Sequence, residues 1–449
     1  MRPYDWLAQT ALRTPDAIAL DDGRERITYA ELDLRAGQIA AALASMGVEA
    51  GSTVLLRLGE GLGKAIQVHA LIRLRAVAVP VEGDLPPEEI AKAIDAVSPD
   101  HEIGPEPGPT EPIPTGFDPG RPEPSDVLCR ILTGGSTGRP KAIALSRENH
   151  FTSAVGSALN LGVEPEDRWF CPVSLSHVSG FSILIRSVIA GTGVFLADHF
   201  TPEALVEAVE ARGVNCASLV PTMLRRTLES GTVPEGLRFA LVGGGPVAGD
   251  LVLAAIEAGI PAVPTYGLTE ACSQVATSTP RDARERPSSA GRPLSVSEVA
   301  IDDGEILVRG PTVSLDALDR DGWLRTGDLG HLDGEGYLFV EGRRDRAILT
   351  GGEKVQPAEV EGVLQADPSV SEAVVFGIPD PEWQQAVVAV VVGVGGEEPD
   401  VEGLRRACQG KLAGFKVPKR VVAVEAMPLN RAGKPNLDAL TDLAERSDR

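Results

Sequence analysis

Apolar and polar residues follow one another in a pattern that predicts alternating strands and helices. Between residues 193 and 220, the apolar run GVFLAD precedes a helix-like stretch, and a second apolar run, NCASLV, follows it. The helix should begin after Thr201, whose hydroxyl suits an N-cap, with Pro202 in its first turn and Gly213 just past its end. Such a unit joins two parallel strands, so this segment is expected to be a β-α-β crossover.

The same pattern recurs along most of the chain. A periodic helix is predicted over residues 29–47, before a strand at 52–58, and strands at 238–244 and 262–267 flank a helix at 248–260. These units indicate a layered α/β architecture with mostly parallel strands under helices. Residues 101–125 are rich in Pro, Gly and Glu, and we expect a surface connection without regular structure there.

After residue 345 the pattern changes. A helix is predicted to begin near Pro357, and it is followed by strands at 371–377 and 386–394, a helix at 401–412 and a strand at 419–427. This order is typical of a small α+β domain. A chain of 449 residues is too long for one core, since single cores stop growing near roughly 250 to 300 residues. We therefore expect an α/β protein with a large layered α/β N-terminal domain and a small α+β C-terminal domain.

The composition is that of a globular protein, with 43% hydrophobic and 24% charged residues. No apolar stretch approaches the roughly 18 to 20 residues that a membrane helix needs, and residues 1–20 lack the features of a signal peptide. No membrane span and a cytoplasmic location are expected. The cysteines are scattered without a CxxC pair, so we expect buried apolar side chains rather than disulfides or a zinc site: Cys129, Cys171, Cys216, Cys272 and Cys408.

The net charge excludes one class of partner. Lys and Arg total 42 against 64 Asp and Glu, which gives a formal charge of −22. Such a surface repels a phosphate backbone, so no nucleic acid partner is expected. To bind a phosphorylated small molecule, the protein would need local groups that contact phosphate, such as backbone NH groups, a few Lys or Arg residues at the site and a divalent metal.

A loop of that kind follows the apolar run VLCRIL. The stretch TGGSTGRPK, from Thr133 to Lys141, can place NH groups and hydroxyls around phosphate oxygens. A Walker A loop would need Gly-Lys-Ser/Thr leading into a helix, whereas here Pro140 precedes the lysine and the apolar run AIAL follows. We therefore expect a loop between two strands; a flexible Gly/Ser turn without a ligand is the alternative.

This loop resembles the signature loop of the acyl-adenylate-forming superfamily, which includes acyl-CoA synthetases, peptide-synthetase adenylation domains and firefly luciferase. Four further motifs follow in family order: YGLTE from Tyr266, TGD from Thr326, GRRD from Gly342, and NRAGK ending at Lys434. Each motif is weak alone, but five in order over essentially the whole chain make the resemblance specific. It implies a domain of residues 1–342, a mobile lid domain of residues 346–449, and a hinge near Asp345.

The resemblance assigns roles to particular residues. It implies a nucleotide-binding set with ATP and Mg²⁺, in which Glu270 is the metal ligand, Thr269 contacts the α-phosphate, Tyr266 stacks on adenine, Asp328 holds the ribose hydroxyls and Arg343 lies near the sugar and phosphate. An ordinary turn is the alternative for Asp328 taken alone. The remaining members of the nucleotide-binding set are Thr133, Gly135, Ser136, Thr137, Gly138, Lys141, Gly243, Gly244 and Gly267.

Two segments of the small domain are expected to occupy the active site alternately. In the superfamily, the lysine that matches Lys434 binds the carboxylate and phosphate oxygens during adenylation, although an isolated lysine in such a turn is usually solvated. Rotation about Asp345 would then bring Gly351 and Gly352, in GGEK, to a path for the thiol of CoA. GGEK is equally compatible with a plain hairpin turn, and both descriptions can hold together.

The acid substrate is indicated by the stretch beginning at Pro172. Amino-acid-activating relatives place an aspartate in this region, whereas this chain has His177-Val178-Ser179-Gly180. Together with LVGGGP at 241–246 and TYGLTEACSQ at 265–274, it resembles the o-succinylbenzoate:CoA ligases of menaquinone biosynthesis. Candidate pocket residues are His177 (also a catalytic candidate), Ser179, Ser273 and Gln274. A packed His177 without substrate contact is the alternative, and Arg186 either binds an anion or lies on a helix surface.

These features predict an ATP-dependent acid:CoA ligase with ATP, Mg²⁺ and CoA, most similar to enzymes acting on o-succinylbenzoate. Another aryl or acyl acid:CoA ligase and a stand-alone adenylating enzyme that loads a carrier protein stay open, as does homodimer formation. Gly134 and Ala142 replace a serine and a glycine of the family pattern, which motivates a third alternative, a degenerate adenylate-binding protein. One lost hydroxyl removes a hydrogen bond of about 0.5 to 1.5 kcal/mol, so activity is expected.

Overall fold

The computed structural model describes residues 5–105, 113, 117–118, 120–133, 140–429 and 435–446. The chain divides into two compact units, each with its own core. The first consists of Met1–Ala300, Leu307–Arg325 and Gly336–Leu338, and the second of Ile301–Ile306, Thr326–Glu335 and Phe339–Arg449. The domain bounds 1–342 and 346–449 stay a prediction.

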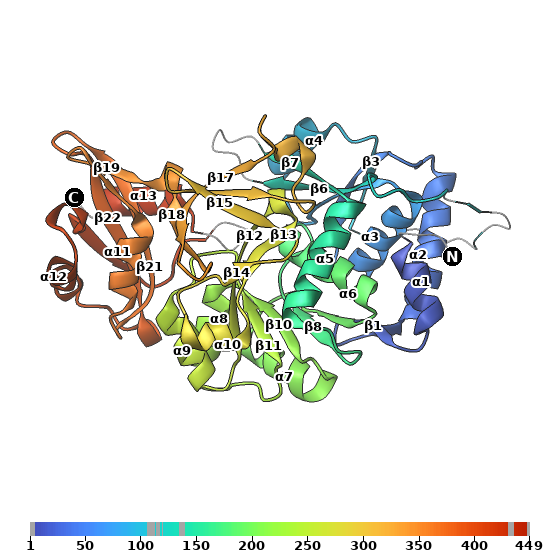
Figure 1. The fold of residues 1–449 in the computed structure, drawn as a ribbon, viewed down its shortest axis with the longest axis horizontal. Coiled ribbons are helices and arrows are strands. Elements are labelled where there is room, and N and C mark those ends of the chain that lie inside the picture. The colour runs from blue at the N-terminus through green and yellow to red at the C-terminus, as the bar shows by residue number, and fades with distance from the viewer. Residues whose placement is uncertain are drawn as a thin grey trace. The chain divides into compact units, whose positions relative to one another are not determined.

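The first unit is built on two sheets that are largely parallel (Figure 1). In spatial order, the nine-stranded sheet contains β14 (Arg292–Pro293), β13 (Ser273–Thr277), β12 (Ala262–Leu268), β11 (Phe239–Val242), β10 (Cys216–Leu219), β8 (Arg168–Cys171), β9 (Gly193–Leu196), β1 (Ile18–Asp21) and β2 (Arg26–Thr28). The five-stranded sheet contains β5 (His101–Ile103), β3 (Thr53–Leu58), β4 (Val77–Glu82), β6 (Val127–Thr133) and β7 (Lys141–Ser146). In the nine-stranded sheet, the neighbours run parallel from β12 through β11, β10, β8 and β9 to β1. In the five-stranded sheet, the neighbours run parallel from β5 through β3 and β4 to β6.

Helices connect and cover these strands. They are α1 (Trp6–Arg13), α2 (Tyr29–Ser45), α3 (Gly63–Leu74), α4 (Pro87–Val97), α5 (Arg147–Leu161), α6 (Val178–Ala190), α7 (Pro202–Arg212), α8 (Pro221–Glu229), α9 (Gly249–Glu257) and α10 (Pro280–Glu285), with 3-10 turns η1 (Thr269–Ala271) and η2 (Leu315–Ala317). Local chemistry sets where they start. Thr28 with Glu31, and Ser146 with Asn149, form capping boxes at α2 and α5. As predicted, Thr201 caps α7, and Gly213 ends it at φ 70°.

Alternating burial along the strands shows how the layers stack. In β3, Val54 and Leu56 belong to a core shared with α2, α3 and α6, whereas Leu55 between them faces the cluster under α4. In the other sheet, Trp169 belongs to the same central core, while its neighbour Phe170 packs with α7, α8 and α9. The central helices therefore lie between the two sheets, and both sheets are covered on both faces, as parallel sheets require.

A separate four-stranded sheet has the order β15 (Glu298–Asp302), β16 (Glu305–Arg309), β17 (Leu324–Leu332) and β18 (Leu338–Arg343), and each strand passes from one unit into the other. The second unit then continues with η3 (Arg344–Arg346), β19 (Ile348–Thr350), β20 (Glu353–Val355), α11 (Pro357–Gln365), β21 (Val370–Asp380), β22 (Gln384–Gly393), η4 (Val394–Gly396), α12 (Val401–Lys411), η5 (Gly414–Lys416), β23 (Arg420–Val424) and α13 (Leu437–Arg446).

The small sheet of the second unit also has a core on each face. Its order is β20-β19-β22-β21, with β23 parallel to β22. Val375 and Ala389 face α11 and α12, whereas Val374 and Val388 face α13. The predicted fold class, a large layered α/β domain with a small α+β domain, is confirmed.

One expectation is wrong. Residues 101–125 were expected to lack regular structure, but His101–Ile103 form β5, which pairs with β3 from Val54↔His101 onward. The Asp100 carboxylate accepts a hydrogen bond from the Thr53 amide at 2.8 Å and fixes this register. Pairing with a strand that is distant in the sequence therefore forms β5, which the local composition does not predict. The expected burial of the cysteines is confirmed, since all five are buried and free.

Candidate active site

Most of the functional residues predicted in the first unit lie at one edge of the nine-stranded sheet. The carboxyl ends of the parallel strands β8, β10, β11 and β12 meet at this edge. The strand order reverses beside β8, because β9 lies on one side while β10, β11 and β12 continue on the other. Ligands of open α/β sheets bind outside the carboxyl ends at such a switch point. The edge carries His177, Ser179, Gly243, Gly244, Tyr266, Gly267, Thr269 and Glu270.

Thr269 and Glu270 lie on a short turn with unusual backbone geometry. Strands β12 and β13 are antiparallel, and η1 connects them. The turn leaves through Cys272 and Ser273, which have φ of 51° and 87° although neither is glycine. The Ser153 hydroxyl donates to the Cys272 carbonyl at 2.7 Å, and the Ser314 amide donates to the Glu270 carbonyl at 2.8 Å. Surrounding groups thus hold a strained turn, a feature that occurs often at functional sites.

Gly267 is required by the close approach of the two strands. A Cβ atom at this position would lie 1.6 Å from the Ser273 carbonyl oxygen, and the pairing register shifts between Tyr266 and Gly267. Tyr266 itself is buried. The YGLTE motif therefore has a structural requirement in addition to its predicted role in nucleotide binding.

The Glu270 carboxylate is available for a cation. Its side chain is half-buried, and no described residue forms a hydrogen bond or ion pair with this carboxylate. Within the described part of the chain, no three His, Cys, Asp or Glu residues form a metal-binding group. Mg²⁺ commonly takes one or two protein carboxylates and keeps waters and phosphate oxygens. A single carboxylate that forms no hydrogen bond or ion pair with a described residue fits Mg²⁺.

Two glycines follow the end of β11. A Cβ atom on Gly243 would lie 2.6 Å from the Thr265 Cγ2 atom, and Gly244 has φ of 80°. Both positions therefore favour glycine because of local geometry. Gly244 is exposed, so its backbone is accessible to a ligand.

His177 is the N-cap residue of α6, and the preceding loop is tied to the second sheet. The Ser176 hydroxyl donates to Glu82, at the end of β4, at 2.6 Å. A Cβ atom on Gly180 would lie 2.3 Å from the Ser174 carbonyl oxygen, so glycine lets α6 start against this loop. His177 and Ser179 are half-buried. The loop thus joins the carboxyl ends of strands from both sheets.

Ser273 and Gln274 begin β13, but their side chains differ in environment. Ser273 is half-buried, whereas Gln274 is buried and donates to the Thr277 hydroxyl at 3.2 Å. Gln274 also accepts a hydrogen bond from Arg186 at 3.3 Å. Arg186 is 7% exposed, so the alternative that it lies on a helix surface is wrong.

The phosphate-loop candidate connects an antiparallel strand pair. Thr133 ends β6 and pairs with Lys141, which begins β7, and the Thr133 hydroxyl donates to the Lys141 carbonyl at 3.3 Å. A strand follows the loop, so the Walker A alternative, which needs a helix there, is excluded. Lys141 is exposed. Gly134, Gly135, Ser136, Thr137 and Gly138 lie outside the described residues.

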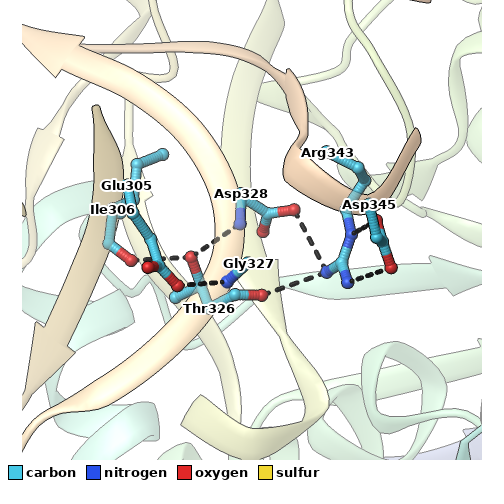
Figure 2. A network of polar contacts seen from close by, with 7 residues as sticks. All are labelled: Glu305, Ile306, Thr326, Gly327, Asp328, Arg343 and Asp345. Atoms are coloured by element: carbon cyan, nitrogen blue, oxygen red, sulfur yellow. Dashed lines mark hydrogen bonds and ion pairs between the residues drawn. The ribbon is translucent and has the colours of Figure 1, made fainter. Parts of the chain in front are cut away.

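In the second unit, Asp328 belongs to a polar network (Figure 2). The Thr326 hydroxyl donates to the Ile306 carbonyl at 2.7 Å and accepts from the Asp328 amide at 3.0 Å. Glu305 accepts from the Gly327 amide at 2.9 Å. The TGD segment, which lies within β17, is thereby held by hydrogen bonds on both sides. Nothing in the sequence pattern marked Glu305 as a member of this network.

Arg343 connects this segment of β17 to Asp345. Its NH1 group donates to the Thr326 carbonyl at 3.0 Å and to Asp328 at 3.3 Å. Its Nε and NH2 groups donate to both Asp345 oxygens at 3.0 and 3.1 Å. These hydrogen bonds raise the pKa of Arg343 and lower that of Asp345. Arg343 therefore lies between two carboxylates, those of Asp328 and Asp345.

The predicted hinge and the predicted thiol-path segment follow Arg343 closely in the sequence. Asp345 is in η3, between β18 and β19. Gly351 and Gly352, with φ of 59° and 85°, form the turn of the β19–β20 hairpin, and both are exposed. The hairpin description of GGEK is confirmed, while its part in a thiol path stays a prediction. Lys434 lies outside the described residues, between Leu429 and Pro435, which form an antiparallel bridge.

No helix in the described part of the chain is long and apolar enough to cross a membrane.

Comparisons with known proteins agree with these motifs. Residues 7–112 and 101–315 match the model of the AMP-binding enzyme family, and residues 359–434 match that of the AMP-binding enzyme C-terminal domain. The 2-succinylbenzoate–CoA ligase of Bacillus cereus is 34% identical over 98% of each chain, and that of Bacillus cytotoxicus is 35% identical over 96% of each. The o-succinylbenzoate CoA synthetase of Bacillus subtilis, solved with its acyl-adenylate intermediate, is 33% identical with a TM-score of 0.88, covering 98% of this chain and 99% of that one. The same enzyme solved with ATP and magnesium has a TM-score of 0.86 over the same shares of the two chains. This chain belongs to the AMP-binding enzyme family.

Proposed function

We propose that this chain is an ATP-dependent acid:CoA ligase that acts on 2-succinylbenzoate, also called o-succinylbenzoate, in menaquinone biosynthesis. The observation that carries the proposal is identity of 34% over 98% of the chain to a ligase named for that acid. A structure of similar fold with ATP and magnesium, and another with the acyl-adenylate, support ATP, Mg²⁺ and CoA as the reactants and cofactor.

The reaction has two steps. A carboxylate oxygen attacks the α-phosphorus of ATP, the bond to pyrophosphate breaks, and acyl-AMP forms. The sulfur of CoA then attacks the acyl carbon, the thiol proton is lost, and AMP leaves. Both reactants of the first step are anions, so catalysis depends on placing positive charge and NH donors around the phosphoryl oxygens.

The first unit supplies groups for adenylation. We assign Glu270 to hold Mg²⁺, which when bound neutralises charge on the phosphates, and Thr269 to donate a hydrogen bond to the α-phosphate. Tyr266 is assigned to adenine, and Gly243, Gly244 and Gly267 to the surrounding backbone. Thr133 and Lys141 frame the phosphate loop, whose other proposed members are Gly135, Ser136, Thr137 and Gly138.

The second unit supplies the ribose contact and the residues for the change between steps. We assign Asp328 to the two ribose hydroxyls, which a carboxylate can bind through both oxygens, and Arg343 to the sugar and phosphate. Lys434 is assigned to the carboxylate and phosphate oxygens during adenylation. Asp345 is the proposed hinge, and Gly351 and Gly352 the proposed lining of the thiol path.

The acid carries a second carboxylate, so its pocket needs polar donors as well as an apolar wall. His177, Ser179 and Ser273 are half-buried at the active-site edge and suit this role. Gln274 belongs to the same proposed set, but its amide is already hydrogen-bonded to Arg186 and Thr277. We therefore expect Gln274 to position its neighbours more than to contact the acid. A cytoplasmic location and a homodimer stay predictions.

Mass spectrometry of the product tests the proposal. The protein is incubated with ATP, Mg²⁺, CoA and a panel of acids that includes 2-succinylbenzoate, benzoates and fatty acids. We expect the 2-succinylbenzoyl thioester to form fastest. Turnover of other acids without 2-succinylbenzoate would overturn the substrate, and acylation of a holo carrier protein without any CoA product would overturn the thiol acceptor.

Pyrophosphate release separates an enzyme from a degenerate adenylate-binding protein. Lys434→Ala should strongly reduce release in the presence of acid and ATP, because it removes a charge next to the reacting oxygens. Glu285→Gln, a change on an exposed helix surface, is the control and should leave release unchanged. Absence of release from the unmodified protein with every acid tested would contradict an enzymatic role.

A further inference from the structure

A cavity of about 210 Å³ lies in the first unit, away from the candidate active site. It is lined by α5, α6 and residues that precede β8 and β9, including Asp167 and Thr192. His177, in contrast, follows the carboxyl end of β8. The cavity and the candidate active site therefore lie at opposite edges of the same sheet.

The cavity has a mostly apolar wall and a buried positive charge. Arg186 lines it, is 7% exposed, and stacks on Trp169 with 5.2 Å from its guanidinium carbon to the ring centre. Its hydrogen bonds go to the Ser182 carbonyl, the Ser157 hydroxyl and Gln274, which are all neutral groups. No carboxylate among the described residues forms an ion pair with it. Burying a charge without a counter-charge is unfavourable.

The one carboxylate in the wall of the cavity already accepts hydrogen bonds from other residues. Asp167 accepts from Arg238 at 2.9 Å on each oxygen and also from the Asn215 amide at 3.1 Å. It neither neutralises Arg186 nor leaves a free negative charge to repel an anion. The Thr192 hydroxyl, in contrast, is buried in the wall without a hydrogen-bond partner. The group that the cavity offers to an anionic ligand is therefore the Arg186 guanidinium.

We propose that this cavity binds a small monocarboxylate with an apolar body, such as an aromatic acid, whose carboxylate pairs with Arg186 and whose ring lies against Trp169 and Ile189. The volume suits a single ring, since a cavity of about 150 Å³ accommodates benzene. Exposed Gly162 and Val163 lie at the surface end of the lining and provide an entry path.

Occupancy is coupled to the active-site edge through one hydrogen bond. Arg186 shares its NH1 group between Ser157 and Gln274, and Gln274 begins the strand that leaves the strained turn. A carboxylate that draws the guanidinium towards the cavity weakens the bond to Gln274. The ligand therefore acts as an effector that does not compete with the acid substrate.

Fluorine NMR of the full chain labelled with 5-fluorotryptophan tests the site directly. Trp169→Phe assigns the signal of Trp169 among the four tryptophans. Benzoate should shift this signal saturably, with a dissociation constant on the order of 1 mM. Benzyl alcohol, which has the same ring without the charge, should bind about tenfold more weakly, because it lacks the charge-assisted hydrogen bond. Equal binding of the two, or no shift with benzoate, would overturn the proposal.

Two variants separate loss of the site from loss of the fold. Arg186→Gln removes the charge and should abolish the preference for benzoate over benzyl alcohol. Ala158→Phe fills the cavity from α5, keeps Arg186, and should eliminate the shift by both ligands while the other tryptophan signals stay in place. If saturating 2-succinylbenzoate and ATP displaced benzoate competitively, the cavity would belong to the substrate site and the proposal would be wrong. This readout does not depend on turnover, so it stands apart from the proposed ligase activity.

Discussion

Arg343 donates to both carboxylate oxygens of Asp345, at 3.0 and 3.1 Å, while its remaining terminal nitrogen reaches Asp328 at 3.3 Å. The predicted hinge residue and the predicted ribose ligand thus share one guanidinium (Figure 2). Of the two aspartates, only Asp328 is proposed to contact ATP. The same replacement at each aspartate in turn therefore distinguishes loss of nucleotide binding from loss of a hydrogen-bonded partner of Arg343.

We expect Asp328→Asn to raise the KM for ATP by about tenfold or more, since it removes a charged acceptor of two ribose hydroxyl bonds. The variant should also lose its preference for ATP over 2′-deoxy-ATP. Pyrophosphate release at varied nucleotide concentration measures both effects. A KM that stays within about twofold of the original would contradict the ribose assignment.

Asp345→Asn makes the same chemical change on the other side of Arg343, and it is the control. Asp345 is more than half exposed, so the pair contributes little to stability, about 0 to 1 kcal/mol. The KM for ATP should change by less than about threefold, because Asp328 keeps its carboxylate. An increase equal to that of Asp328→Asn would show that the pairing with Arg343, and not the ribose contact, sets the affinity.

Glu270→Gln should weaken the response to Mg²⁺. The amide keeps the shape of the side chain but removes the charge that favours a hard divalent cation. We expect the Mg²⁺ concentration for half-maximal pyrophosphate release to rise by about tenfold or more, with kcat also reduced. Glu298→Gln, which removes an exposed partner of Arg309, should leave the Mg²⁺ response unchanged. Identical Mg²⁺ curves for the original protein and Glu270→Gln would remove this residue from the metal site.

Much of this organisation could be predicted because local signals and long-range structure agree. The Thr201 cap, Pro202 and Gly213 specify α7 locally, and close approach or positive φ explains Gly243, Gly244 and Gly267. The network in Figure 2 was predicted in part: Asp328 and Arg343 lie in motifs, but Glu305 joins them only when β16 and β17 are folded.

Arg186 shows what sequence reasoning missed and which signal was present. The helix VSGFSILIRSVIA is apolar around most of its circumference, and such helices are buried between layers. A charged residue in such a helix is therefore expected inside the protein, where the structure places Arg186. Strand β5 carried no comparable signal, because its order comes from Asp100 and from pairing with β3.

Gly267→Ala should destabilise the first unit. Its Cβ atom would lie 1.6 Å from the Ser273 carbonyl oxygen, so the strands must separate at the strained turn. We expect a loss of about 2 to 4 kcal/mol in the free energy of unfolding, measured by urea denaturation. Gly63→Ala in the first turn of α3 meets no atom within 4 Å and should change stability by less than about 0.5 kcal/mol. Normal stability of Gly267→Ala would show that the two strands can move apart without loss.

Two buried histidines make stability depend on pH. Burial lowers the pKa of His69 and of His150 to about 3, while a histidine in the unfolded chain titrates near ~6.5. Between these values the unfolded state binds protons that the folded state does not, so the free energy of unfolding falls as pH decreases from 6.5. The loss should be about 1 kcal/mol per pH unit for each histidine.

Urea unfolding at pH 7, 6 and 5 checks this expectation, since carboxylates titrate mainly below that range. His69→Gln removes one of the two groups and should reduce the slope of stability against pH by about half, whatever its effect on stability at pH 7. His199→Gln should leave the slope unchanged, because the His199 side chain is exposed to solvent when the chain is folded. If the slope were unchanged after replacement of both His69 and His150, other groups would carry the proton linkage, and both imidazoles would be protonated in the folded chain as well as in the unfolded one.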